Sequence, residues 1–224
     1  MVQELRNQDF QWPIISPLEI KKAVLKNPIF ADYLLKNEFP FLKRREINGF
    51  GQKGNYKHWY KHGKLHREDG PAIIASFEEQ STFYEEWYLN GKRHREDGPA
   101  IIGNHRNTCW YKHNLLHRED GPAVKRLNGD IEWWLNGGIH RENGPAIERY
   151  NGDKEWWLNG KLHREDGPVI EAANGDKHWA KNGLSHREDG PASEYADGRK
   201  RWYLNGKQLS QLRFQENERE KAQI

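Results

Sequence analysis

The residues best suited to chemistry in this sequence are histidines that are each followed by an arginine and by acidic side chains. The motif is written HREDGPA at residues 94–100, and its copies start at His66, His94, His117, His140, His163 and His186. Histidine beside a carboxylate is a common acid–base pair, and arginine is a common phosphate ligand. The motif therefore raises three hypotheses: acid–base catalysis, metal binding and binding of phosphate-bearing ligands.

Repetition argues against the first two hypotheses. An enzyme builds one asymmetric constellation from different residues, whereas this chain supplies the same set six times. We therefore expect no catalytic residues and no enzymatic activity. Zinc ligands lie about 2.1 Å from their ion, but equivalent residues of neighbouring two-stranded units lie about 9.5 Å apart. One histidine from each unit cannot share a metal, so we expect neither a metal site nor a cofactor.

An internal repeat indicates which structural elements position these motifs. Seven tryptophans are separated by 28 residues once and then by 23 residues five times, and the histidines keep the same spacing. These tryptophans are Trp59, Trp87, Trp110, Trp133, Trp156, Trp179 and Trp202. A fixed period of this length indicates stacked units, each of which buries its apolar surface against its neighbours.

Two turn signals divide each unit into strands. An Asn-Gly pair such as Asn136-Gly137 follows five of the seven repeat tryptophans, at positions where a two-residue hairpin needs positive φ, and His113-Asn114 takes its place after Trp110. A second turn, such as Asn128-Gly129-Asp130, ends the unit. Identical units in one antiparallel meander need an even number of strands, so we expect two strands per unit. HREDGPA then forms a kink in the longer strand, because proline gives no ladder donor.

The sequence thus predicts a mainly β protein with three parts. Residues 47–209 are expected to form a single elongated antiparallel β-meander of 23-residue two-stranded repeats. Residues 1–46 are expected to form a helical N-terminal cap, because Ser16-Pro17-Leu18-Glu19 is a capping box. Residues 210–224 are expected to be a charged, helical tail. Only 35% of residues are hydrophobic, which predicts a thin core.

The cysteine content and hydropathy bear on location. Cys109 is the single cysteine, which excludes an internal disulfide and favours a reducing compartment. The sequence has no apolar run of membrane-spanning length and no signal-peptide pattern. We therefore expect a cytoplasmic protein without a transmembrane segment.

The run WYLNGKRH at residues 87–94 resembles the central part of a MORN repeat, which is rich in aromatic residues and glycine and is built on an Asn-Gly-Lys-x-His hairpin. The resemblance covers residues 54–207. It departs after the histidine, where MORN units carry Gly-x-Gly and this chain carries REDGPA. This variant resembles repeats in proteins of phages and large viruses. The resemblance implies an elongated β-meander used for protein binding, self-association or contact with anionic lipid heads, and it does not imply catalysis.

Two aromatic stripes are expected, because successive side chains of a strand point to opposite faces. The repeat tryptophans and the motif histidines form the buried structural stripe. The residues after the tryptophans form a second stripe, which is the candidate partner groove: Tyr88, Tyr111, Trp134, Trp157 and Tyr203. Its candidate polar rim consists of the motif arginines Arg67, Arg95, Arg118, Arg141, Arg164 and Arg187.

Several functions stay open at this point. The main expectation is a non-enzymatic scaffold that binds a protein partner through an aromatic-lined face. The first alternative is a ligand sponge, of a viral anti-defence kind, that holds phosphate-bearing small molecules with histidine and arginine. The second is binding of nucleic acid or anionic lipid. Residues 47–209 hold 25 Lys and Arg against 24 Asp and Glu, a near-neutral balance that disfavours nucleic acid.

Alternatively, the motif is purely structural. Its acids then pair with arginines of the same or the neighbouring unit, and each histidine either packs beside a tryptophan or bridges two units. The segment 75–86 carries the five extra residues of the long interval. It is either a partner-binding loop or a longer hairpin.

Overall fold

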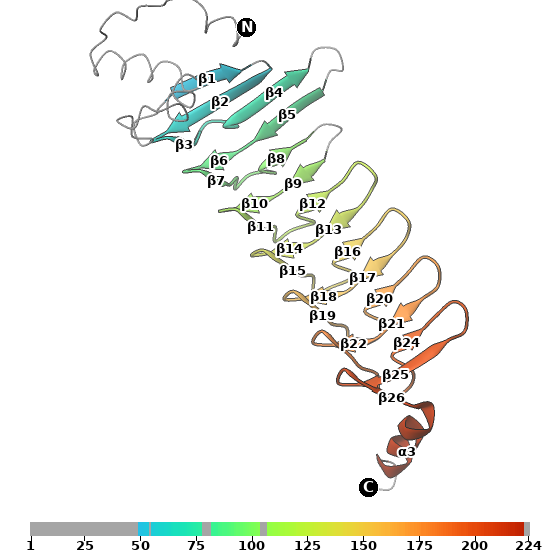
Figure 1. The fold of residues 1–224 in the computed structure, drawn as a ribbon. Helices are drawn as coiled ribbons and strands as arrows, with labels where there is room; N and C mark the ends of the chain where they lie inside the picture. The colour runs from blue at the N-terminus through green and yellow to red at the C-terminus, as the bar shows by residue number, and fades with distance from the viewer. Residues whose placement is uncertain (1–48, 54, 78–81, 104–106, 222–224) are drawn as a thin grey trace, which may run out of the picture.

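The computed structural model describes residues 49–53, 55–77, 82–103 and 107–221. These residues form one long antiparallel sheet, five short hairpins beside it and the helix α3 (Gln211–Lys221). Figure 1 shows the units stacked in chain order into an elongated array with α3 at its C-terminal end. The predicted mainly β meander and short C-terminal helix are confirmed. The expected N-terminal helical cap lies outside the described residues.

The main sheet takes its strands in chain order. They are β1 (Gly49–Lys53), β2 (Tyr56–Lys61), β4 (Ile73–Phe77), β5 (Thr82–Glu86), β8 (Ile101–Ile102), β9 (Thr108–Cys109), β12 (Val124–Lys125), β13 (Ile131–Glu132), β16 (Ile147–Glu148), β17 (Lys154–Glu155), β20 (Ile170–Glu171), β21 (Lys177–His178), β24 (Ser193–Glu194), β25 (Lys200–Leu204) and β26 (Lys207–Leu209), with β3 (Lys64–Leu65) beside β2.

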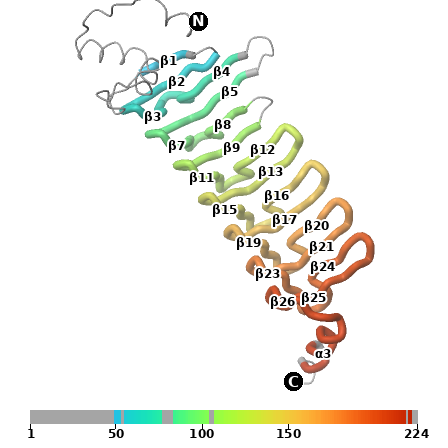
Figure 2. The backbone as a smooth tube through the Cα atoms, viewed as in Figure 1, coloured from blue at the N-terminus to red at the C-terminus, as the bar shows by residue number. Residues whose placement is uncertain are grey.

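The short hairpins line the opposite edge of the array from the loops of the main sheet, as the tube in Figure 2 shows. They are β6–β7 (Tyr88–Leu89, Lys92–Arg93), β10–β11 (Tyr111–Lys112, Leu115–Leu116), β14–β15 (Trp134–Leu135, Gly138–Ile139), β18–β19 (Trp157–Leu158, Lys161–Leu162) and β22–β23 (Ala180–Lys181, Leu184–Ser185). In the five units between β2 and β25, each of the two expected strands is therefore divided between the main sheet and a hairpin, whereas β2 and β25 themselves run undivided through Trp59 and Trp202.

The repeat tryptophan is the point of division. The N–H of Trp133 donates to the carbonyl of Ala146, 2.8 Å away, on the main-sheet side. The carbonyl of Trp133 accepts from the N–H of His140, 3.1 Å away, on the hairpin side. The same two bonds recur at Trp110 and Trp156. The chain thus passes from one ladder to the other without leaving the tryptophan's backbone groups unpaired.

The hairpin turns follow the expected chemistry. Asn136 has φ of 52° and Gly137 of 81°, and His113 and Asn114, which replace the pair in one unit, have 52° and 72°. Asparagine tolerates the left-handed region better than most residues, because its short polar side chain can bond locally. The two-residue hairpins predicted from the Asn-Gly pairs are confirmed.

Side chains in the loops also connect one unit to the next. The carboxylate of Asp130 accepts from the N–H of Tyr150, 2.8 Å away in the next loop, and Asp153 does the same for Ala173 at 2.7 Å. Neighbouring hairpins are joined by backbone bonds such as that from Gly137 N–H to the Leu116 carbonyl, at 2.9 Å. The array is therefore held at its sheet, its loops and its hairpins.

The core is a line of small side chains. The last residue of each motif is 0% exposed: Ala72, Ala100, Ala123, Ala146, Val169 and Ala192. At the C-terminal end, Phe214 of α3 is also buried, and α3 lies against β25. A core this thin gives each unit little stability of its own, so the units depend on their neighbours.

Candidate functional site

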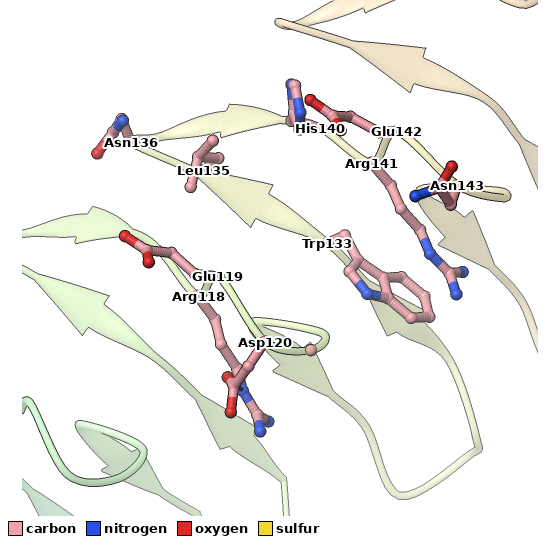
Figure 3. A pocket seen from close by; sticks show the side chains of 11 residues that line it. Arg118, Glu119, Asp120, Trp133, Leu135, Asn136, His140, Arg141, Glu142 and Asn143 are labelled. Atoms are coloured by element: carbon pink, nitrogen blue, oxygen red, sulfur yellow. Dashed lines mark hydrogen bonds and ion pairs between the residues drawn. The ribbon is translucent and has the colours of Figure 1, made fainter.

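Each motif arginine lies over the ring of the tryptophan of its own unit. The guanidinium Cζ is 3.7–4.2 Å from the ring centroid in all six units. The pairs are Arg67 on Trp59, Arg95 on Trp87, Arg118 on Trp110, Arg141 on Trp133, Arg164 on Trp156 and Arg187 on Trp179. The intervening hairpin brings Arg141 back over Trp133 (Figure 3). We call this arrangement the tryptophan–arginine corner.

Carboxylates and carbonyls of the same unit hold the guanidinium in place. In five units its Nε donates to the aspartate two residues later, at 2.8–3.0 Å. In all six, Nη1 donates to the motif proline's carbonyl at 2.8–3.4 Å. In the last three units Nη1 also donates to a glutamate at 2.9–3.0 Å. Arg141, which has Asn143 in place of the aspartate, is paired through this glutamate, Glu148.

The motif glycine makes room for this arginine. A Cβ at Gly98 would lie 2.7 Å from Cζ of Arg95, and a Cβ at Gly167 would lie 2.8 Å from Cζ of Arg164. Among the motif glycines only Gly144 has a positive φ, of 117°. The sequence predicted that Gly-Pro marks a kink. The structure adds that a Cβ at any of the six glycines would lie within 2.7–3.2 Å of the arginine, and that at five of them the backbone angle itself does not require glycine.

Each motif histidine bridges two units. Its Nδ1 accepts a hydrogen bond of 3.0–3.3 Å from a backbone N–H in the hairpin turn of the next unit. In five units its Nε2 lies 3.1–3.6 Å from the glutamate two residues later. An acceptor at Nδ1 requires a ring without a proton there. Burial lowers the pKa of His94, which favours that neutral ring.

In each tryptophan–arginine corner the positive charge is half-buried and the negative charges are exposed. The motif arginine side chains are only 19–28% exposed, whereas the glutamates and aspartates of the motif that pair with its histidine or arginine are 67–84% exposed. The hydrogen bond from Arg95 lowers the pKa of Asp97, and Arg118 does the same to Asp120. These carboxylates therefore stay ionised. The surface of the corners is acidic, although the chain as a whole carries a net charge of +3.

Grooves separate consecutive corners. One, of about 600 Å³, has Trp133 and Leu135 on its floor, Glu119 and Asp120 on one side and Glu142 on the other (Figure 3). The next, of about 670 Å³, has the equivalent floor of Trp156 and Leu158. A third, of about 700 Å³, has Lys181 at the leucine position. We call these the corner grooves. The first two combine an apolar floor with walls of three carboxylates and two paired arginines.

The second aromatic stripe is not covered by the side chains of the motif arginines, which lie over the first stripe. Its members Tyr88, Tyr111, Trp134, Trp157 and Tyr203 are half-buried. The indole N–H of Trp134 donates to Glu132 and that of Trp157 to Glu155, both at 2.9 Å. The structure therefore joins the motif arginines to the first stripe of tryptophans. It does not bring the arginine side chains to the second stripe, although their backbone N–H groups reach it: Arg118 N–H donates to the Trp134 carbonyl of the next unit, at 3.0 Å.

Sequence reasoning missed a buried polar cluster around Glu86, which is 5% exposed. Its carboxylate accepts from the hydroxyls of Tyr84 and Tyr88, the latter at 2.6 Å, and from Nε of Arg93 at 2.9 Å. Burial opposes ionisation, but these bonds outweigh it and lower the pKa of Glu86. Burial and the Glu86 charge raise the pKa of Tyr88 to about 12. Tyr84, Glu86 and Tyr88 alternate along the chain, a signal that could have placed them on one face.

The segment 75–86 belongs to a regular hairpin. Its flanks pair in β4 and β5, from Ile73 opposite Glu86 to Phe77 opposite Thr82. The extra residues therefore lengthen the sheet locally. Residues 78–81, which join the two strands, lie outside the described residues.

The described ranges contain neither a metal-binding cluster nor a membrane-spanning helix. No group of three or more His, Cys, Asp or Glu side chains there is arranged to hold a metal ion. No helix there is both long enough and apolar enough to cross a membrane. Comparison of the whole sequence with models of protein families and with curated proteins gave no match to either.

Proposed function

We propose that this protein is a non-enzymatic repeat scaffold that binds a protein partner along its corner grooves. The observation that carries the proposal is that different residues of the motif have different roles, some structural and some exposed to a partner. Histidine and arginine are used in joints, whereas the carboxylates and the groove floor formed by Trp133 and Leu135 face outward. A repeated groove with an apolar floor and a polar rim is typical of protein interfaces.

The bonds of the arginines weigh against the ligand-sponge alternative. To bind phosphate, Arg118 would have to exchange its bond to Asp120 for one to the ligand. It would also have to leave, or share, its position on Trp110. The carboxylates beside it would repel an anion. The same repulsion weighs against nucleic acid and anionic lipid.

The remaining parts of the proposal rest on the sequence. The MORN-like class, and the group of phage and large-virus repeat proteins, are supported by the Asn-Gly hairpins that follow five of the seven repeat tryptophans. A cytoplasmic location is supported by the single cysteine, Cys109. Self-association is compatible with the same grooves.

Affinity capture from the native host, followed by mass spectrometry of proteins and small molecules, tests the proposal. The wild type is compared with a Leu135→Arg, Leu158→Arg variant, which fills two groove floors with charge. The matched control is Leu127→Arg, because Leu127 is 66% exposed in a sheet loop. We expect a protein that the wild type and the control retain and the groove variant does not. Equal recovery by all three, or recovery of none, would refute the proposal.

Arginine variants separate the scaffold from the sponge. If the arginines serve as joints, Arg118→Ala and Arg141→Ala each lower the melting temperature, and the wild type binds no inorganic phosphate or nucleotide. If instead the wild type binds these anions, and the variants keep the wild-type melting temperature but no longer bind them, the ligand-sponge hypothesis is correct.

A further inference from the structure

We propose that the corner grooves bind an extended basic segment of a partner protein, with a lysine or arginine at every third residue. The inference rests on the proposed scaffold function and names the chemistry of its partner. Three features of the grooves carry it: their charge, their floor and their spacing.

The charge of the motif ladder is negative where a partner would meet it. The six motifs hold six arginines and eleven carboxylates, so the ladder carries a net charge of −5 when the histidines are neutral. The arginines are half-buried and already paired, and the carboxylates point outward. Two of these carboxylates also have lysine partners, Lys61 with Glu68 and Lys181 with Glu165. No lysine lines the two grooves on either side of the 140–143 corner, each of which has three carboxylates against two paired arginines, although Glu165 of the second groove is the partner of Lys181.

The floor suits the stem of a long cationic side chain. Lysine and arginine bury their methylene groups against apolar surface while the charged head stays among polar groups. Trp133 and Leu135 form such a surface, and Glu119 and Glu142 stand on opposite sides of it. Arg141 already occupies the ring face of Trp133. An incoming cation would therefore bind at the carboxylates, with its stem on the floor.

The spacing of the grooves selects the conformation of the segment. Consecutive units are two strands apart in the main sheet, which is about 9.5 Å. A polyproline II helix advances about 3.1 Å per residue with three residues per turn, or about 9.3 Å per turn. Every third side chain then points the same way at the interval of the grooves. A β-strand does not meet this condition, because its side chains alternate between faces.

Binding of synthetic peptides tests the inference on the full-length protein. The probe is a labelled peptide of five Lys-Pro-Pro triplets, and its control contains the same residues with all lysines together. Fluorescence anisotropy at low salt should show at least about tenfold tighter binding of the triplet peptide, weakening as salt is added. Equal affinity for the two peptides, or tighter binding of an oligothymidylate of similar length, would overturn the inference.

Charge-reversal variants locate the binding surface. Glu119→Lys with Glu142→Lys should weaken the triplet peptide at least about tenfold. Glu216→Lys with Glu220→Lys makes the same charge change on α3, away from the grooves, and should weaken it less than about twofold. Equal weakening by the two variants would overturn the groove assignment. If the leucine variants no longer retain a captured partner but no triplet peptide binds, the scaffold proposal stands and the basic-segment inference fails.

Discussion

Replacing Gly98 by alanine tests whether the motif glycine exists to admit the arginine. The new Cβ would lie 2.7 Å from Cζ and 2.8 Å from Nε of Arg95, so the guanidinium must move. It would then leave Trp87, whose ring centroid is 4.0 Å from Cζ, and Asp97, 2.8 Å from Nε. The backbone is no obstacle, because Gly98 does not have a positive φ.

The size of the effect follows from the two interactions that Arg95 would give up. A partly buried cation–π interaction contributes about 0.5–2 kcal/mol, and an ion pair with an exposed aspartate contributes about 0.2–1 kcal/mol. Alanine recovers about 0.4–1 kcal/mol by restricting the unfolded chain. We therefore expect Gly98→Ala to lower the free energy of unfolding by about 1 kcal/mol, between the limits of about 0 and 2.5 kcal/mol that these terms set. In an Arg95→Ala background the same change should stabilise by about 0.4–1 kcal/mol.

Urea unfolding followed by tryptophan fluorescence and circular dichroism measures this double-mutant cycle. The two probes must coincide, because repeat arrays can unfold in parts. Gly138→Ala is a tolerated control, since the nearest atom to its Cβ would be 3.7 Å away. Gly144→Ala is the opposite control, because its φ of 117° penalises alanine even after Arg141→Ala. Equal destabilisation by Gly98→Ala with and without Arg95 would refute the reasoning.

Three further predictions follow from the core, the buried cluster and the histidines. Ala146→Val should change the free energy of unfolding by less than about 1 kcal/mol, because Val169 fills the equivalent buried site, whereas Ala146→Leu should cost about 1–3 kcal/mol in the same urea assay. Glu86→Ala leaves the buried donors of Tyr84, Tyr88 and Arg93 without their acceptor and should lower the free energy of unfolding by about 2–4 kcal/mol. In the same variant, phenolate absorbance should show that the pKa of Tyr88 falls from about 12. Burial lowers the pKa of His94, so the unfolded chain binds the proton more readily. The melting temperature should therefore fall as pH drops below about 6.5, less so in His94→Gln.

The fold was predictable where local chemistry decides it. Asn136-Gly137 requires a two-residue hairpin, and this turn sets His140 opposite Trp133. The division of each strand at the tryptophan was not predictable. It depends on Trp133 bonding one way to Ala146 in the main sheet and the other way within the hairpin. The period of the repeat predicts the number of strands per unit, but it does not predict whether a given backbone group pairs in the main sheet or in the hairpin.

The candidate site was harder to predict, because its partners lie in different units. The six histidines were found by type and spacing, but the Nδ1 partner of His117 is the N–H of Asn136, in the next hairpin. The sequence analysis expected the motif arginines to form a polar rim beside the second aromatic stripe, which requires their side chains to lie on the same face as Trp134. Trp134 instead binds Glu132, two residues earlier on the same face. Arg141 follows the turn onto the other face, over Trp133.

Recognition in such an array should therefore depend on the positions that differ between units. His, Arg and Gly recur in every motif and make the same joints, so they cannot distinguish one groove from the next. The floor position does differ: it is Leu135, then Leu158, then Lys181. Lys181 places a positive charge where the other two grooves offer apolar surface. A cationic segment should thus bind the two leucine-floored grooves more tightly than the third, so its affinity should fall from the Leu158 groove to the Lys181 groove.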